Sequence, residues 1–328
     1  MKTAGPGRWN RHSSQVEEAR NLWRVREAFD QGRAALSELE NAQNQLTRVF
    51  LGLEENIGID AVSDGGFRWD SAFDISRKLV HCEGFKILHR IAETNHFHRA
   101  PEVGLAPVWR EPILKSDLQF AKANTSKEIL VSLAGPYTLA RQSIVAAGSG
   151  IDLENLAYAY ADALGKEIRE LLNDGACAVK VDEPYLLLYP NDWDLINGVL
   201  RWLTLASDQN RVFLSTWFHP VNKFLNYFDL PFGGFFLDFT GGSDNLLGNL
   251  NVLKDFPANK ILGAGMVDSR HPALAPIEDL LYWLRQILKR VPRENLWLTP
   301  SADLDFLPWD IAVLKLKQLV DLKKELGR

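Results

Sequence analysis

The stretch GACAVKVDEPYL at residues 175–186 decides the fold class of this 328-residue chain. A short apolar run ends on two adjacent acids, Asp182 and Glu183, and Pro184 then stops the strand. Such a run is typical of a buried strand in a parallel sheet. Because side chains alternate along a strand, we expect one of the two carboxylates to point inward and the other outward.

Similar short runs recur between longer segments with helical spacing, which predicts repeated βα units. The expected strands lie at residues 57–63, 129–133, 176–181, 212–218, 235–239, 261–267 and 296–299, with an eighth at residues 2–5. Eight such strands close a barrel. The sequence therefore predicts an α/β fold, a single (β/α)8 TIM barrel over residues 1–328. Residues 68–127 are expected to form an insertion over the barrel mouth, after the second strand.

Apolar residues at helical spacing predict four helices, at residues 36–53, 153–173, 277–291 and 309–326. Asp152 precedes the second of these and is expected to cap it. Ser301 or Asp310 is expected to cap the last.

The composition excludes several classes of protein. The 37 basic and 42 acidic residues give a net charge of −5 with no block of like charge, so we expect no nucleic-acid partner. No window reaches the roughly 18 uninterrupted apolar residues of a membrane span, so no membrane partner is expected. Only two cysteines occur, at unrelated positions, which favours a reducing, cytoplasmic location.

The residues that follow the strands are unusually acidic, and in a barrel these positions form the active face. Clustered carboxylates cost free energy unless a ligand or a cation offsets their repulsion, so the pattern predicts a binding site. Alternatively, each Asp simply caps the helix that follows it. As catalytic residues we expect Asp182, Asp238 and Asp268. As substrate-binding residues we expect Asp64, Arg68, Glu183, Trp217, His219, Arg270, His271 and Asp303.

Further motifs follow residues 175–186 in a fixed order. They are KILGAGMVDSRHP at residues 260–272 and ENLWLTPSADLDFLP at residues 294–308, and IGIDAVSDGGFRWD and ILVSLAGPYTL precede them at residues 57–70 and 129–139. Together these motifs make the chain resemble the cobalamin-independent methionine synthase family. The likeness is to the catalytic C-terminal barrel, within the uroporphyrinogen decarboxylase-like superfamily, and it covers nearly the whole chain.

The resemblance implies transfer of a methyl group from methyl-folate to homocysteine, whose thiol is bound to zinc as a thiolate. The family's four zinc ligands are His, Cys, Glu and Cys. On our pairing their positions hold Ser215, Trp217, Asp238 and Ala302. A zinc site needs about four N, S or O donors, so we expect no zinc and no metal ligands here. The family's ammonium-binding Glu corresponds to Gly66, while the second ammonium-binding acid, Asp182, is present.

We therefore expect a divergent family member that transfers a methyl or other one-carbon group without the usual zinc-thiolate site. In this hypothesis Asp182 orients a cationic or amino-acid-like small-molecule substrate, and Asp238 and Asp268 act as acid/base or electrostatic groups. Arg270 and His271 hold an anionic part. No bound cofactor is expected; the methyl donor would be a folate, or a corrinoid on a partner protein.

Two alternatives stay open. The first is a metal-free lyase or decarboxylase of the same superfamily, in which Arg68 and Arg270 hold substrate carboxylates. The second is a barrel without catalytic activity that binds a ligand or a protein partner. In that case the Trp217 ring fills the space that a metal ligand vacated.

Overall fold

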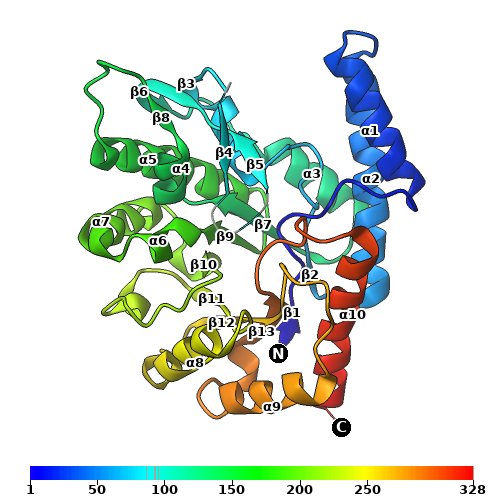
Figure 1. Ribbon diagram of the computed structural model, residues 1–328, viewed down its shortest axis with the longest axis vertical. Helices are drawn as coiled ribbons and strands as arrows, with labels where there is room; N and C mark the ends of the chain where they lie inside the picture. The colour runs from blue at the N-terminus through cyan, green and yellow to red at the C-terminus, as the bar shows by residue number, and fades with distance from the viewer. Residues whose placement is uncertain (86, 92–93, 95, 328) are drawn as a thin grey trace.

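Eight parallel strands form the centre of the molecule (Figure 1). The structure, a computed structural model, describes residues 1–85, 87–91, 94 and 96–327. Along the sheet the order is β1 (Lys2–Thr3), β13 (Leu296–Pro300), β12 (Ile261–Val267), β11 (Gly234–Asp238), β10 (Val212–Thr216), β9 (Ala178–Asp182), β7 (Glu128–Ala134) and β2 (Ala61–Val62). A parallel bridge between Ala4 and Ala61 joins the two ends of this order. The predicted (β/α)8 barrel is therefore confirmed.

Four predicted strands are shorter in the structure than expected: β1 ends at Thr3, β9 begins at Ala178, and β2 and β10 are shortened by the backbone conformation beside them. Residue 57 ends helix α2 (Leu36–Ile57), and Gly58 stops that helix in the left-handed region at φ 99°. The strand β2 consequently begins only at Ala61. Strand β10 ends at Thr216 rather than at residue 218, since Phe218 has a positive φ of 76° that a strand does not accommodate.

The four predicted helices are present as α2, α5 (Leu153–Asn173), α9 (Ile277–Leu288) and α10 (Trp309–Glu325). Asp152 caps α5 as expected, accepting a hydrogen bond from Asn155 N at 2.7 Å. The predicted cap of α10 is wrong. Pro308 precedes that helix without a side-chain cap, and the Ser301 hydroxyl instead accepts from Ser269 N at 3.0 Å.

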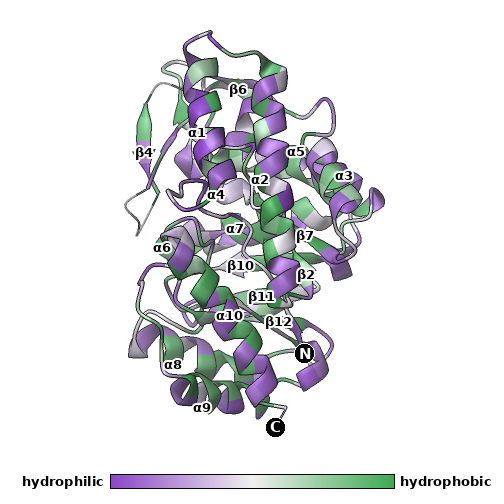
Figure 2. Cartoon of the chain, turned by 90° about the vertical axis from the view of Figure 1, so that its right-hand side faces the viewer, coloured by the Kyte–Doolittle hydropathy of each residue, from purple (hydrophilic) through white to green (hydrophobic). Residues whose placement is uncertain are grey.

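Several further helices were not predicted from the sequence. Helix α1 (Glu17–Asp30) lies against α2 on one side of the barrel (Figure 1), and its visible side is mostly hydrophilic (Figure 2). The others are α3 (Lys115–Asn124), α4 (Pro136–Gln142), α6 (Pro184–Leu188), α7 (Trp193–Thr204) and α8 (Ser243–Val252). Within the described part of the chain, no helix is both long enough and apolar enough to cross a membrane.

A small sheet and a hairpin lie beside the barrel, and apart from β8 (Ile144–Val145), which follows α4, their strands belong to the insertion after β2. In the sheet, β6 (Glu102–Val108) lies between β3 (Val80–Glu83) and β8. The hairpin pairs β4 (Leu88–Arg90) with β5 (Phe97–Arg99). A short 3-10 helix, η1 (Ala72–Lys78), leads into this region from the barrel. The predicted insertion is thus present, and it lies beside β7 and α4 (Figure 1).

A separate apolar cluster fills the barrel near the amino ends of the strands, opposite the mouth. Its ring contacts include Phe213 with Phe236 at 5.6 Å and Phe213 with Trp297 at 5.5 Å between centroids. The other members are Ala4, Ala61, Leu130 and Ala178. Since Leu130 pairs with Ala178, the next interior layer toward the mouth is Ser132 beside Lys180. The first polar side chains of the barrel interior, Ser132 and Lys180, therefore lie directly above the aromatic cluster.

Candidate functional site

Two adjoining cavities open at the carboxyl ends of the strands, where a barrel carries its active site. The first lies between the barrel and the insertion and encloses about 680 Å³, counting space open to solvent. The second, about 530 Å³, extends toward β5 and Phe306. Both are lined by Arg8, Ser71, Ala72, Asp182 and Asp303. We call their combined volume the mouth cleft.

A buried lysine lies behind two carboxylates that form the floor of the mouth cleft, Asp182 and Asp303, and does not itself line either cavity. Lys180 and Asp182 are two residues apart on β9, so both side chains point to the barrel interior. Lys180 Nζ lies 3.3 Å from Asp182 Oδ1 and 3.9 Å from Asp303 Oδ1. Burial alone lowers the pKa of Lys180, but Asp182 and Asp303 outweigh it and the net shift is upward. Lys180 is therefore a buried ammonium ion.

Asp303 is held in place by the N-terminal segment. Its Oδ1 accepts hydrogen bonds from Gly7 N at 3.1 Å and Arg8 N at 3.2 Å. Burial raises the pKa of Asp303 to about 7, although Lys180 acts in the opposite direction. A carboxyl group with this pKa exchanges protons near neutral pH, which suits it to acid/base chemistry.

Arg8 supplies the second cation of the mouth cleft. Its Nη2 donates to Trp69 O at 2.8 Å, and its Nε lies 3.4 Å from Asp305 Oδ2. Among the described residues, three buried oxygens of residues that line this region make no hydrogen bond, Ser132 Oγ, Asp305 Oδ1 and Asp182 Oδ1, the last of which has only its ion pair with Lys180. Unsatisfied buried polar atoms at the edge of a cavity indicate a place for a ligand or a water.

Asp64, which follows β2, and Asp117, on α3, line the first cavity. Burial raises the pKa of Asp117 to about 6, helped by Asp64 and opposed by Arg68. Arg68 Nε lies 3.4 Å from Asp117 Oδ1, and its guanidinium stacks on Phe120. Arg68 therefore orients an acidic wall of the cleft but does not line it.

Glu183 points away from the mouth cleft and binds the start of α4. Its two oxygens accept from Tyr137 N at 2.8 Å, Thr138 N at 2.9 Å and Thr138 Oγ1 at 2.6 Å. Burial raises the pKa of Glu183 to about 7, although these bonds lower it. Glu183 is fully buried, so it holds the start of α4 in place and does not face the cleft.

Asp238 and Asp268 likewise hold loops. Asp238 is fully buried and accepts from Phe218 N at 3.0 Å and Thr240 N at 2.7 Å; burial raises its pKa. Asp268 accepts from Arg270 N at 2.8 Å. Neither residue lines the mouth cleft, so their predicted catalytic roles stay predictions without geometric support.

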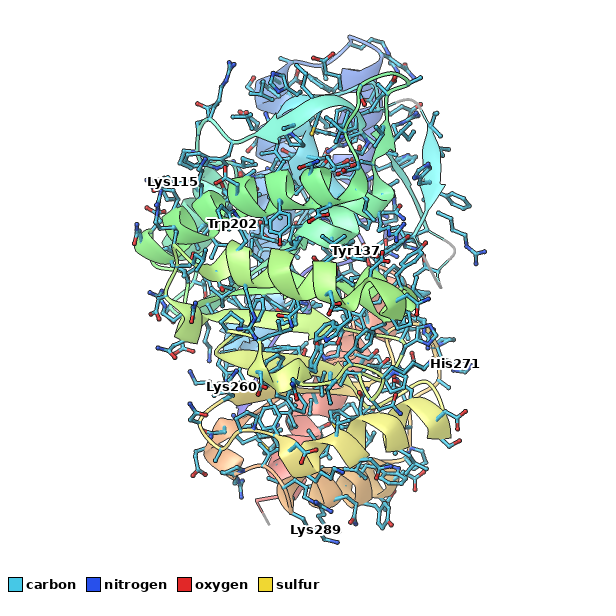
Figure 3. The ribbon with its side chains drawn as sticks, turned by 90° about the vertical axis from the view of Figure 1, so that its left-hand side faces the viewer. Lys115, Tyr137, Trp202, Lys260, His271 and Lys289 are labelled. Atoms are coloured by element: carbon cyan, nitrogen blue, oxygen red, sulfur yellow. The ribbon has the colours of Figure 1, made fainter. Side chains whose placement is uncertain are left out.

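The remaining predicted residues are divided between the cleft and the surface. Trp217 lines the second cavity, with its ring 6.4 Å from that of Phe306. The guanidinium of Arg270 lies 3.9 Å from the centre of the Phe218 ring. His271 is exposed at the edge of the molecule (Figure 3), and His219 does not line either cavity.

Thus four of the predicted site residues come together at the mouth cleft, namely Asp64, Asp182, Trp217 and Asp303. Seven do not line it: Arg68, Glu183, His219, Asp238, Asp268, Arg270 and His271. Three residues of the site were not predicted from the sequence: Arg8 and Ser132, which line the cleft, and Lys180, which lies behind Asp182 and Asp303. For Lys180 a signal existed, because a charged residue two positions before Asp182 in a buried strand must share its face.

Comparison with known proteins decides the family. A family model described as "Cobalamin-independent synthase, N-terminal domain" matches residues 70–292, well over half of the chain. The chain belongs to this family. The family that the motifs indicated is confirmed; the matching model describes the N-terminal domain, whereas the motif resemblance was to the C-terminal barrel.

Relatives of this synthase-family chain include the methionine synthase of Pyrococcus horikoshii, 26% identical over 320 residues that cover 94% of this chain and 90% of that protein. The methionine synthase of Saccharolobus solfataricus is 25% identical, covering 90% and 89%. The 5-methyltetrahydropteroyltriglutamate–homocysteine methyltransferase of Bacillus subtilis is 26% identical, and the match covers 95% of this chain but only 41% of that longer protein.

Solved structures support the fold of this family member. The B12-independent methionine synthase of Shewanella sp., in complex with selenomethionine, has a TM-score of 0.76 at 19% identity and covers 90% of this chain and 92% of its own. The putative vitamin-B12 independent methionine synthase of Listeria monocytogenes also has a TM-score of 0.76, at 16% identity, covering 99% and 98%. At these identities the likeness concerns the barrel alone.

Proposed function

We propose that this chain transfers a methyl or other one-carbon group to a small molecule bound in the mouth cleft, and that it does so without a zinc-thiolate site. The observation that carries the proposal is the coincidence of a family-typical barrel with a cleft built around Asp182, Lys180 and Asp303. Methyl transfer is the activity that the names of several relatives state, and it comes to this chain as part of the proposal.

The donor set argues against zinc. Of the four positions paired with the family's zinc ligands, Trp217 and Ala302 carry no side-chain lone pair that binds a metal. Asp238 already accepts hydrogen bonds with both oxygens. Among the described residues, no group of three or more His, Cys, Asp or Glu side chains is arranged to hold a metal ion. These residues do not fit a four-donor zinc site.

Without a metal, the acceptor must lose its proton to a protein group. Asp303 is the carboxyl group best suited to take it, since it lines the cleft and has a pKa of about 7. The methyl group then forms a bond to the acceptor as its bond to the donor breaks. A folate nitrogen takes up the released proton, whereas with a corrinoid donor the electron pair stays on the donor and Asp303 passes the proton to water. Lys180 and the backbone N–H groups of Gly7 and Arg8 hold Asp303 in position.

The test is a methyl-transfer assay in the presence of a chelator, with methyl-folate or a methylated corrinoid protein as donor and a thiol as acceptor. We expect turnover that chelation does not abolish. The Asp303→Asn variant, which keeps an oxygen for the Gly7 and Arg8 N–H groups, should lower kcat by about 100-fold or more. Absence of turnover with every donor, metal-free or metal-loaded, would contradict the proposal, and turnover that requires added zinc would contradict its metal-free part.

A further inference from the structure

The charges on the floor of the mouth cleft are already paired within the protein. Asp182 and Asp303 both approach Lys180 Nζ, at 3.3 and 3.9 Å. Lys180 is 4% exposed and Asp182 is 8% exposed, so water screens this group weakly. A carboxylate pair in such a place is the binding site that a ligand ammonium would use.

Lys180 cannot easily withdraw from this position. Its Cα pairs with Ser132 on β7 and with Phe213 on β10, in the centre of the sheet. Below it lie Phe213, Phe236 and Trp297, so the ammonium has only the carboxylates toward which to point. Moving an unpaired charge into this aromatic cluster is strongly unfavourable, because the charge would lose both water and its carboxylate partners.

We infer that Lys180 is the specificity-determining residue of the mouth cleft: its ammonium fills the site between Asp182 and Asp303, and the cleft selects substrates without an ammonium at that position. This inference rests on the proposed function and specifies its substrate class. The substrate presents an uncharged group to Asp182 and Asp303, as a mercapto acid without an α-amino group does with its methylene carbon.

The second cation supports the same class. Arg8 Nη1 lies 2.9 Å from the point where a Cβ at Gly66 would be, so the guanidinium borders the first cavity. Arg8 is thus a cation of the cleft lining that can form a charge-assisted hydrogen bond with a substrate carboxylate, whereas Lys180 lies behind Asp182 and Asp303 and occupies the place of a ligand ammonium.

The first test compares two thiols that differ only in the amino group, homocysteine and 4-mercaptobutanoate, by calorimetric titration. The wild-type protein should bind homocysteine no better than 4-mercaptobutanoate. The Lys180→Gln variant removes the ammonium and should shift the affinity ratio toward homocysteine by at least about tenfold. Lys315→Gln is the matched control, because Lys315 is another buried lysine whose Nζ binds Ala273 O outside the cleft; its ratio should equal that of the wild type.

The second test needs no substrate. Lys180→Ala leaves the acid pair without its cation and should lower Tm, and n-butylammonium chloride should raise the Tm of this variant more than sodium chloride of equal concentration does. The wild-type protein should show no such difference. This rescue reports on the ammonium site even if no methyl transfer is found.

The two tests separate the possible failures. A wild-type preference for homocysteine of tenfold or more, or an unchanged ratio in Lys180→Gln, overturns the inference. Absence of n-butylammonium rescue together with absence of binding also overturns it. Rescue without binding of either thiol, by contrast, supports the role of Lys180 and counts against the proposed function alone.

Discussion

Glu183 and Asp182 are neighbours in the sequence, but the structure gives them opposite surroundings. Asp182 faces the mouth cleft and Glu183 binds the N-terminus of α4. The alternation along β9 predicted that one would point inward and the other outward. Which loop Glu183 would meet was not predictable, because α4 follows a strand some fifty residues earlier.

Glu183 also predicts a pH dependence of stability. Its pKa is about 7 in the folded protein and about 4.5 when unperturbed, so the folded state holds this proton more tightly than the unfolded chain. The free energy of unfolding should therefore fall, by about 3 kcal/mol from this group, as pH rises from about 4.5 to about 7. Urea unfolding of wild type and Glu183→Gln across this range should show a smaller fall in the variant. Parallel curves would contradict the assignment, and the exposed Glu154→Gln serves as control.

Gly7 predicts a steric effect at the site. A Cβ here would lie 2.4 Å from Ser132 Oγ and 2.9 Å from Asp303 Oδ1. The Gly7→Ala variant should lower the free energy of unfolding by about 1–3 kcal/mol and weaken binding in the mouth cleft. Gly52→Ala is the control, since nothing lies within 4 Å of its added methyl group and it is in the interior of α2. That variant should be unchanged or stabilised by up to about 1 kcal/mol.

At the scale of the element, the spacing of apolar residues predicted four of the helices, because their apolar faces are features of the local sequence. Helix α5 was predicted with its bounds and its cap, because its apolar face and Asp152 are both local features. The early end of β10 was not, since the positive φ of Phe218 accompanies a long-range bond from its N–H to Asp238. The same bond explains why Asp238 does not line the cleft: a carboxylate at a strand end serves either a ligand or a loop, and its tertiary contacts here are with a loop.

The cap of α5 gives an element-scale prediction. Asp152→Ala removes the acceptor of the Asn155 N–H and should lower the free energy of unfolding by about 1 kcal/mol. Glu154→Ala, in the same first turn and exposed, should change it by less than about 0.5 kcal/mol. Chemical denaturation measures both, and equal effects would show that the cap contributes nothing specific.

At the scale of the whole molecule, the barrel is closed at its lower end by the aromatic cluster. Phe213 packs against Phe236 and Trp297 within this closed volume, so Phe213→Ala should leave a cavity and lower the free energy of unfolding by about 3–5 kcal/mol. Leu225→Ala, at a position 78% exposed, should have little effect. Urea unfolding measures both variants. A small effect of Phe213→Ala would mean that the aromatic cluster does not stabilise the barrel beneath the cleft.

The barrel itself was predictable, because its strands recur as short apolar runs along the whole chain. The location of the site was predictable only in outline. Asp182 and Asp303 were found from their positions after strands, but Arg8 and Ser132 join them through contacts between distant segments. Such contacts leave no periodic trace in the sequence.

The most direct measurement is a crystal structure of the protein, treated with a chelator and then soaked with 4-mercaptobutanoate. We predict the ligand in the mouth cleft, with its thiol near Asp303 and its carboxylate within hydrogen-bond distance of Arg8. A ligand bound elsewhere, or a tetrahedral metal ion retained beside Ser215 and Asp238, would contradict the account.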